Sequence, residues 1–223
     1  MKKILMLAVA AVMATMSASA QYEPGKWSVD IKVGLGASWI NNTEKLNLNG
    51  FELDKQVQPS VMFQAGTSYQ LNKFLSLSAG LNFMMQGQAW KNLEVSNTKY
   101  QSNALELTYI QIPVMAHVYV FKGLSIDAGI QPGFLVNADM TCYIESKTAA
   151  GRKMTNYQRV DYMDDLKKFD LNVPLGISYE FNNHLVLGAQ YNLGLSKVNK
   201  DEFSNKSMKN GAVLITLGYK IGL

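Results

Sequence analysis

Six charged residues stand at alternating positions in otherwise uncharged or apolar segments, so their side chains would face a common interior. They are Asp30, Lys32, Asp127, Asp170, Glu180 and Lys220. Moving a charge out of water is costly unless the charge is paired or stays hydrated. These residues could therefore form a structural network of salt bridges and hydrogen bonds, or they could line a narrow path that selects ions.

Nucleophilic catalysis would need a histidine beside a serine and an acid. His117 precedes a predicted short turn at residues 122–123, and His184 follows another at 182–183. We expect His117 to form hydrogen bonds in the interior and His184 to lie at a turn, without catalytic roles. Two histidines and one cysteine, Cys142, at these spacings match no metal-ligand pattern. We therefore predict no catalytic residue, no metal site and no cofactor.

The first twenty residues have the pattern of a cleaved signal peptide. Lys2 and Lys3 precede an apolar run at residues 4–14, and Ala18-Ser19-Ala20 forms a cleavage site. The apolar run is shorter than the about 20 residues of a spanning helix. We expect a mature protein of residues 21–223 in one domain, without a lipid anchor because position 21 is not cysteine. Its net charge, near +2, is too small to indicate a nucleic-acid partner.

Eight segments of the mature chain alternate apolar and polar residues with a period of two, which is typical of β-strands with two unlike faces. A hydrophobic content of 48% excludes a disordered chain, and one cysteine excludes a disulfide scaffold. An even strand count suits a closed bacterial barrel, whose interior at eight strands is just wide enough for side chains to fill. This favours the structural network over an ion path. The segments are 27–39, 61–71, 75–86, 105–121, 124–138, 168–181, 185–195 and 213–223.

The connections between these segments alternate in length. Three are short turns, at residues 72–73, 122–123 and 182–183. Outer-membrane barrels have short periplasmic turns and long extracellular loops. We therefore expect both termini on the periplasmic side, which also places both histidines away from surface-exposed lipid A. The four long connections, expected to be loops, are 42–57, 87–104, 139–167 and 197–209.

Alternation alone leaves open which face points outward. A soluble lipocalin-like carrier would turn its apolar face inward. The polar face here is rich in Gly, Ser, Asn and Gln, whereas a water-exposed surface would carry more Lys and Glu. Aromatic residues also form two bands, as at the two interfaces of membrane barrels. We therefore expect the apolar face of the strands to point outward and to contact lipid. One band is Trp27, Tyr69, Phe74, Phe121, Tyr179, Phe181 and Tyr219, and the other is Trp39, Phe83, Tyr109, Phe134 and Phe169.

The long loops carry further candidate groups. Cys142 is either a small neutral loop residue or the site of an intermolecular disulfide. Basic residues of the third and fourth loops could bridge lipopolysaccharide phosphates, or they could simply be solvated. The third loop mixes Lys147, Arg152, Lys153 and Arg159 with Asp161, Asp164 and Asp165. The fourth has Lys197, Lys200, Lys206 and Lys209 against Asp201 and Glu202.

Three stretches carry a resemblance to a known family. Tyr-Ile-Gln-Ile-Pro-Val at 109–114 resembles the Tyr-Leu-Glu-Ile-Pro-Leu strand of the PorT-like outer-membrane β-barrel family of Bacteroidota. The family's Phe-Asp-x-Gly…Gly-x-x-Tyr-Glu-Phe strand is similar to Phe-Asp-Leu-Asn-Val-Pro-Leu-Gly at 169–176 with Tyr-Glu-Phe at 179–181. The Tyr-x-x-Gly-Leu of its next strand is similar to Tyr-Asn-Leu-Gly-Leu at 191–195. The resemblance implies an outer-membrane barrel. Most members have no assigned activity, and a few are similar to a component of a protein secretion and gliding apparatus.

These patterns predict an all-β protein, an eight-stranded antiparallel up-and-down transmembrane β-barrel in the cell outer membrane. We expect a non-enzymatic, monomeric protein with a structural or surface-interaction role. Its partners would be outer-membrane lipid and lipopolysaccharide. Other envelope or secretion proteins could also be partners. An accessory subunit of a protein secretion complex is the alternative. A lipid-A-modifying enzyme, which would use His117 or His184, and a soluble lipocalin-like carrier are weaker alternatives.

Overall fold

The computed structural model describes residues 23–48, 50–147, 152–182, 184–200 and 207–223. The predicted signal peptide, residues 1–20, lies outside these ranges. All regular secondary structure in the described residues is β-strand. No described helix is long and apolar enough to cross a membrane.

Eight strand positions form the main body of the molecule, and each corresponds to one predicted segment. The fourth position is interrupted, because Ile112 and Pro113 separate β8 from β9. Proline has no amide hydrogen to donate, so it breaks a ladder that the sequence pattern alone predicts as continuous. The strands are β1 (Trp27–Asn41), β5 (Gln58–Asn72), β6 (Leu75–Trp90), β8 (Thr98–Gln111) with β9 (Val114–Phe121), β10 (Leu124–Lys147), β12 (Phe169–Glu180), β13 (Leu185–Gly194) and β14 (Lys209–Gly222).

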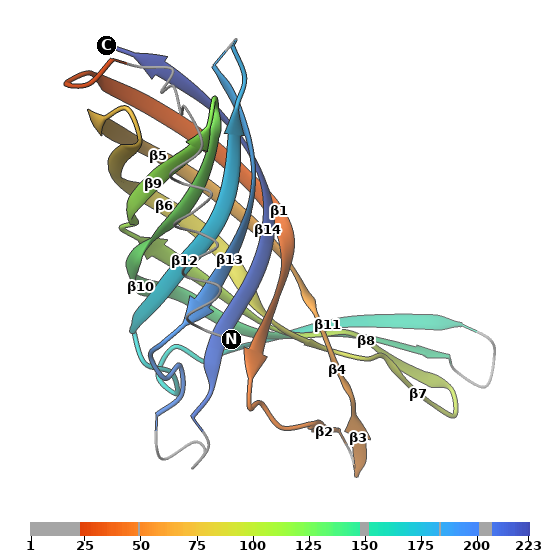
Figure 1. Ribbon diagram of the computed structural model, residues 1–223. Coiled ribbons are helices and arrows are strands. Elements are labelled where there is room, and N and C mark those ends of the chain that lie inside the picture. Colours follow the sequence, from red (N-terminus) through yellow and green to blue (C-terminus); the bar gives the residue numbers. More distant parts are fainter. Residues whose placement is uncertain (1–22, 49, 148–151, 183, 201–206) are drawn as a thin grey trace, which may run out of the picture.

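These strands close on themselves as an antiparallel ring (Figure 1). The last strand, β14, pairs with the first, β1, along a register that runs from Ser28 opposite Gly222 to Asn41 opposite Lys209. Strand β6 pairs with β9 near the short turns and with β8 further along, and both pair with β10. The ring therefore has no open edge among its eight positions.

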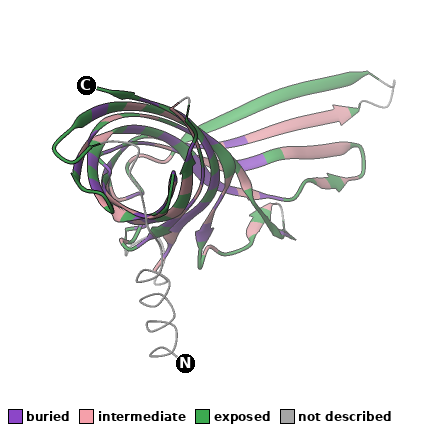
Figure 2. Cartoon of the chain, turned by 45° about the horizontal axis from the view of Figure 1, so that its top comes forward, coloured by how far each residue is buried: buried purple, intermediate pink, exposed green. Residues whose placement is uncertain are grey.

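The apolar face of the ring points outward. Figure 2 shows buried and exposed residues alternating along the ring strands. Leu35, Leu81 and Ile215 are about 60% exposed, at 65%, 63% and 59%. The outward positions of β1 from Trp27 to Trp39 and of β5 from Val61 to Leu71 carry no charged residue. This polarity is the reverse of that of a soluble lipocalin-like carrier, whose apolar side chains would face inward.

The three short turns gather at one end of the ring, which is named here the turn end. The opposite end is named the loop end. Leu223 N donates to Trp27 O at 2.8 Å, so the start of β1 and the end of β14 lie together at the turn end. The predicted turn at 122–123 is confirmed, whereas the first turn lies at residues 73–74, one residue beyond the predicted 72–73, because Asn72 still belongs to β5. The third turn includes Asn183, which is outside the described residues.

Three of the connections predicted as loops contain strands, and this corrects the expectation. Residues 42–57 hold β2 (Leu46–Leu48), β3 (Phe51–Leu53) and β4 (Lys55–Gln56). Beyond the ring, β8 and β10 extend together and add β7 (Leu93–Val95) and β11 (Lys153–Asp161) at their flanks. Strands β2, β3, β4 and β7 have three residues or fewer, too few for alternation to mark a strand. Strand β11 mixes polar and apolar residues, so pairing with β10 is what makes it a strand.

The extensions of β8 and β10, with β7 and β11, form a four-stranded sheet that we name the arm. It projects sideways from the loop end (Figures 1 and 2). All nine residues of β11 are exposed. Ion pairs cross the arm between Lys153 and Glu145 at 3.3 Å and between Lys99 and Glu94 at 3.0 Å. The arm thus differs from the ring, because its surface carries charged side chains whereas the outer face of the ring is apolar.

An apolar cluster fills the loop end of the ring from inside. Tyr109 belongs to it and is fully buried, which corrects its predicted place in the outer aromatic band. Ile110 faces outward, and consecutive strand residues face opposite sides, so Tyr109 must face inward. Connecting segments supply Leu166, Val198 and Met208, held by hydrogen bonds such as Val198 N to Met208 O at 2.9 Å. The apolar residues of the connections therefore cover the interior at this end.

Candidate functional site

The polar interior near the turn end is the candidate site, and it begins with a chain of three side chains. His117 on β9 lies opposite Asp127 on β10 in the strand register. His117 Nδ1 is 2.8 Å from Asp127 Oδ1, and His117 Nε2 is 2.8 Å from the Ser78 hydroxyl on β6. Ser125 and Ser178 also donate to Asp127, each at 2.7 Å. The Asp127 carboxylate is thus held by three neighbouring side chains.

The order serine, histidine, aspartate is the connectivity of a nucleophilic triad. Acyl transfer further needs space for the substrate and donors aimed at the developing oxyanion. The cavity lined by Ser78 and His117 has a volume of about 50 Å³, a third of the roughly 150 Å³ that admits benzene in an engineered protein cavity. Backbone amides of β6 at this level belong to the ladders with β5 and β9. The three residues are therefore arranged as a packed hydrogen-bonded chain that has no place for an acyl group.

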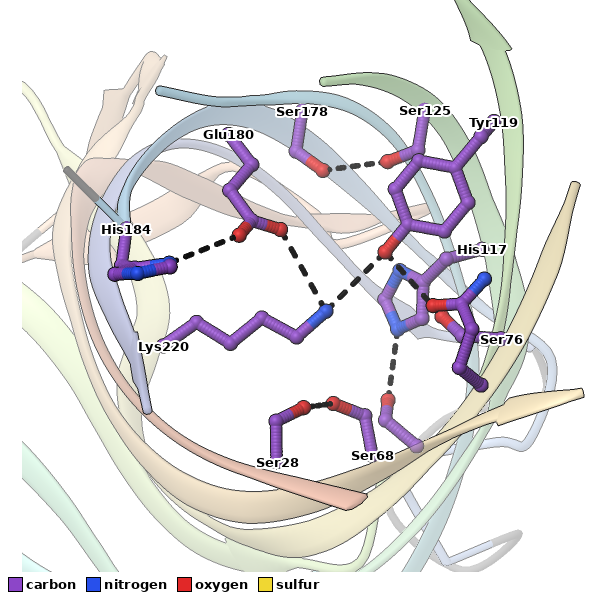
Figure 3. A network of polar contacts seen from close by, with 12 residues as sticks. Ser28, Ser68, Ser76, His117, Tyr119, Ser125, Ser178, Glu180, His184 and Lys220 are labelled. Carbon is purple, nitrogen blue, oxygen red and sulfur yellow. Dashed lines mark hydrogen bonds and ion pairs between the residues drawn. The ribbon is translucent and has the colours of Figure 1, made fainter. Parts of the chain in front are cut away.

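A second group of contacts centres on Lys220, and Figure 3 shows it inside the ring. Lys220 Nζ lies 3.6 Å from Glu180 Oε2 and donates to the Tyr119 hydroxyl at 3.2 Å. The other carboxylate oxygen of Glu180 is 3.6 Å from His184 Nδ1. Lys220 and Glu180 are both buried. The ammonium group therefore has one carboxylate and one hydroxyl close by, as a charge in a closed interior requires.

Asp30 and Lys32 line the same cavity from β1, and both are half-buried. Asp30 is the direct register partner of Lys220 across the β1–β14 pair. Four of the six predicted interior charges thus surround one cavity, and Asp127 adjoins it through His117, Ser125 and Ser178. The charges alternate in sign around the cavity wall, which suits mutual compensation.

Asp170 is the exception among the six, because it lies apart, towards the loop end. Its carboxylate accepts hydrogen bonds from Asn172 and Asn210, both at 2.9 Å, and from the Ser196 hydroxyl at 2.5 Å. Asn210 also donates to the hydroxyl of Tyr109 at 3.2 Å. Neutral donors therefore solvate this buried carboxylate, and the six charges do not make one continuous network.

Between the two groups the interior is filled by amides and a small apolar cluster. Gln111 accepts from Asn82 at 2.9 Å and from Gln131 at 2.6 Å. Met62, Met84, Ala212 and Leu214 pack together and are completely buried. Sequence reasoning missed these partners, and it also missed Ser78 and Tyr119. Strand parity was the available signal, since Ser76, Ser78 and Met84 all lie on the face opposite Leu77 and Phe83.

The remaining predicted groups lie in or near the arm. Cys142 is a free, partly buried thiol on β10, opposite Gln158 of β11. Arg159 on β11 pairs with Asp139 on β10, and its hydrogen bond lowers the pKa of the Asp139 carboxyl. Of the predicted fourth-loop charges, Asp201, Glu202 and Lys206 are outside the described residues. No group of three or more potential metal ligands occurs in the described part of the chain.

A model of the family described as outer membrane protein beta-barrel domain matches residues 19–200. No curated protein matches the chain. Among solved structures, the chain is similar to Ail, the attachment invasion locus protein of Yersinia pestis, at 13% identity, with 89% of this chain and 99% of that chain covered and a TM-score of 0.43.

Two other solved structures are similar at the same low level. Neisserial surface protein A is 14% identical, with 86% of this chain and 96% of that chain covered and a TM-score of 0.40. OprG from Pseudomonas aeruginosa is 10% identical, with 90% of this chain and 97% of that chain covered and a TM-score of 0.41. The assignment therefore rests on the family model, which matches more than half of the chain. The chain belongs to the outer membrane protein beta-barrel domain family.

Proposed function

We propose that the protein is an integral, non-enzymatic outer-membrane barrel whose ring crosses the bilayer and whose arm makes contacts at the cell surface. The observation that carries this proposal is the closed ring with apolar residues outside and polar residues inside. A bilayer core offers no hydrogen-bond partners, so a spanning sheet must pair every strand edge with another strand. The ring satisfies this condition, and the outward positions of its strands supply the apolar band.

Aromatic pairs support the placement of the ring between two membrane interfaces. At the turn end, Trp27 contacts Tyr69 with ring centroids 4.9 Å apart, and Tyr179 contacts Phe181 at 4.8 Å. Towards the loop end, the centroids of the exposed Phe134 and Phe169 are 5.7 Å apart. Aromatic side chains concentrate at membrane interfaces. We place the turn end, with the start of β1 and Leu223, in the periplasm, and the arm outside the cell.

The interior supports a packed barrel in place of a pore. Charges at the turn end pair across the cavity, amides fill the middle, and the apolar cluster around Tyr109 covers the loop end. An interior of eight strands holds side chains with little room to spare. The six predicted charges then serve the structure of the barrel and select no ion.

The arm supports a role in surface interaction. Strand β11 pairs only with β10, so its outer edge is unpartnered among the described residues. Exposed Met154, Tyr157 and Val160 lie among basic residues such as Lys153 and Arg159. An exposed strand edge is a template for pairing with another chain, and basic groups suit phosphate-bearing lipopolysaccharide. We propose a protein or lipopolysaccharide contact here, made by a monomeric barrel.

Membership of a protein secretion complex is the second candidate function. The resemblance of residues 109–114, 169–181 and 191–195 to the PorT-like barrels favours it. An envelope-protein pull-down that depends on the arm would support this candidate. Lipid A modification is disfavoured, since Ser78 and His117 face the ring interior, away from lipid.

Gel mobility of the membrane-fractionated protein tests the barrel. We expect the unboiled protein in the outer-membrane fraction to migrate differently from the boiled protein. Orientation is tested with single cysteines in a Cys142→Ala background, Lys153→Cys on the arm against Lys122→Cys at a short turn. An impermeant maleimide should label only the arm variant in intact cells and both after permeabilisation. Labelling of Lys122→Cys alone would reverse the orientation, and a soluble protein without a mobility shift would overturn the barrel.

A further inference from the structure

A second cavity, unlike the polar one, opens at the loop end and has a volume of about 300 Å³. Its walls come from four ring strands and from connections between strands. Ile40 of β1, Trp90 of β6, Leu105 of β8, Met140 of β10, Leu166 and Met208 supply apolar side chains. This cavity is continuous with the buried cluster around Tyr109, because Ile40, Leu166 and Met208 belong to both.

The size of this cavity suits a small molecule. Pockets that bind small ligands occupy roughly 300–1,000 Å³, are mainly apolar and carry a few placed polar groups. An engineered apolar cavity of roughly 150 Å³ already admits benzene. At 300 Å³ the cavity offers space for a bicyclic aromatic or an alkyl chain of roughly ten carbons.

The walls of the cavity belong to the protein interior and differ from the lipid-facing surface. Ile40, Trp90, Leu166 and Met208 are all buried, whereas the outward residues of the ring strands are about half exposed. Leu107 and Tyr109, which pack in the same apolar cluster as the cavity walls, are fully buried. Tyr109 in turn contacts the hydrogen-bonded group around Asp170 through Asn210. The cavity therefore ends inside the ring, and its apolar walls face away from the bilayer.

Most polar side chains of the cavity lie in one rim, and Tyr162 adds a hydroxyl group from another connection. Thr43, Glu44 and Lys45, between β1 and β2, form this rim. The rim is fixed across the end of β6, because Trp90 Nε1 donates to Glu44 O at 3.2 Å and Lys55 Nζ to Thr43 O at 3.0 Å. Lys45 and Glu44 are exposed, so the mouth opens on this side. A ligand would place its apolar body against Leu105 and Leu166 and any polar end towards this rim.

We propose that the loop-end cavity binds one small apolar molecule, with an uncharged or weakly polar end at Thr43–Lys45. This goes beyond the structural and surface role proposed above and needs only the ring with its described connections. The same chemistry could be supplied by a free hydrocarbon or by one acyl chain of an envelope lipid, and the experiment separates these sources.

Tryptophan fluorescence of the protein in lipid vesicles tests the proposal, with 1-bromooctane as the quenching probe. The three tryptophans are Trp27, Trp39 and Trp90, of which only Trp90 lines the cavity. In a Trp27→Phe/Trp39→Phe variant we expect saturable quenching of Trp90 at low probe content. In the matched Trp90→Phe variant, quenching of Trp27 and Trp39 should rise linearly as the probe enters lipid. Linear quenching of Trp90, or none, overturns the proposal.

A cavity-filling variant separates binding from folding. Leu105→Trp in a Trp27→Phe/Trp39→Phe/Trp90→Phe background fills the cavity and supplies its own fluorophore, and saturable quenching should disappear. Its heat-dependent gel shift should remain, so loss of the shift would instead question the barrel itself. Octan-1-ol should compete with the probe if the site takes free molecules. Competition by lysophospholipid alone would assign the site to an acyl chain, and competition by neither contradicts a bound apolar ligand.

Discussion

His117 and Asp127 face each other across the β9–β10 pair, with Nδ1 of the imidazole 2.8 Å from Oδ1 of the carboxylate. The two residues flank the turn at 122–123, so the hairpin itself brings them together. An ideal two-residue turn would place Val118 opposite Asp127. A register shift between Leu124 and Ser125 moves the pairing by one residue. The shift keeps Val118 on the lipid side and gives Asp127 a polar partner in the interior.

Replacing Asp127 with asparagine tests how much this contact stabilises the ring. The change removes the charged acceptor of His117, Ser125 and Ser178, whose polar groups stay inside the ring. Leaving buried donors poorly satisfied costs about 1–3 kcal/mol. We expect a lower free energy of unfolding in urea, measured in lipid vesicles by the loss of β-sheet circular dichroism. Ser78→Ala, which removes one neutral hydroxyl, should cost less, and equal losses would contradict a central role for the carboxylate.

Ser78→Ala also tests whether the serine–histidine–aspartate chain is catalytic. The cavity beside it has a volume of about 50 Å³, too small for an acyl group. We therefore expect the same lipid A species, by mass spectrometry, from cells that express the parent protein or the variant. His117→Gln should likewise leave the profile unchanged. A lipid A species that disappears with both substitutions and returns with the parent protein would establish the enzyme.

Lys220 and Glu180 allow a double-mutant cycle on a buried charge pair. Lys220→Met should destabilise the ring by about 3–5 kcal/mol, because it leaves the Glu180 carboxylate buried without the ammonium group. Adding Glu180→Gln removes that charge, so the double variant should regain much of the loss. The measurement is the free energy of unfolding of all four proteins. Additive losses would show that the 3.6 Å contact contributes little.

The side-chain directions of the ring could be predicted from sequence, but the arm could not. Asp30 and Ile31 show why, since their alternation continues along a whole strand and the structure turns Ile31 outward. In residues 153–161 each face mixes polar and apolar side chains, so no burial preference marks a strand. Pairing with residues 139–147 creates one nevertheless. Such a strand depends on its pairing with a neighbouring strand, and a pattern of alternating residues does not reveal that pairing.

The candidate site was predictable only in part for a related reason. Parity places Lys220 and Glu180 in the interior, but which interior groups meet depends on register, and register depends on turns and bulges. A second shift, between Gln70 and Asn72, adjusts the β5–β6 pair in the same way. Asp170 stays apart from the other five charges because it lies ten residues from Glu180 along β12, and sequence alone gives no partner such as Ser196.

The Asp139–Arg159 pair gives the arm a predicted pH dependence. Arg159, chiefly through its hydrogen bond, lowers the pKa of Asp139 below that of the unfolded chain. The stabilisation is therefore present above the unfolded value, about 3.9, and is lost as the pH falls through the lower folded value. Hydrogen exchange of β11 amides, corrected for intrinsic rates, should show less protection below about pH 4. Arg159→Gln should abolish this change, and an unchanged pH profile in that variant would assign it to other groups.

Gly123 tests the turn between β9 and β10, where the backbone φ is +77°. A Cβ here would lie 2.3 Å from the carbonyl oxygen of Glu180, in contact with backbone. Gly25 has a similar φ of +86° but nothing within 4 Å of the added atom. Left-handed strain of about 1–2 kcal/mol is common to both sites, so Gly123→Ala should destabilise the ring more than Gly25→Ala. Urea unfolding of the two variants measures the difference, and equal losses would mean that the turn adjusts to the added methyl group.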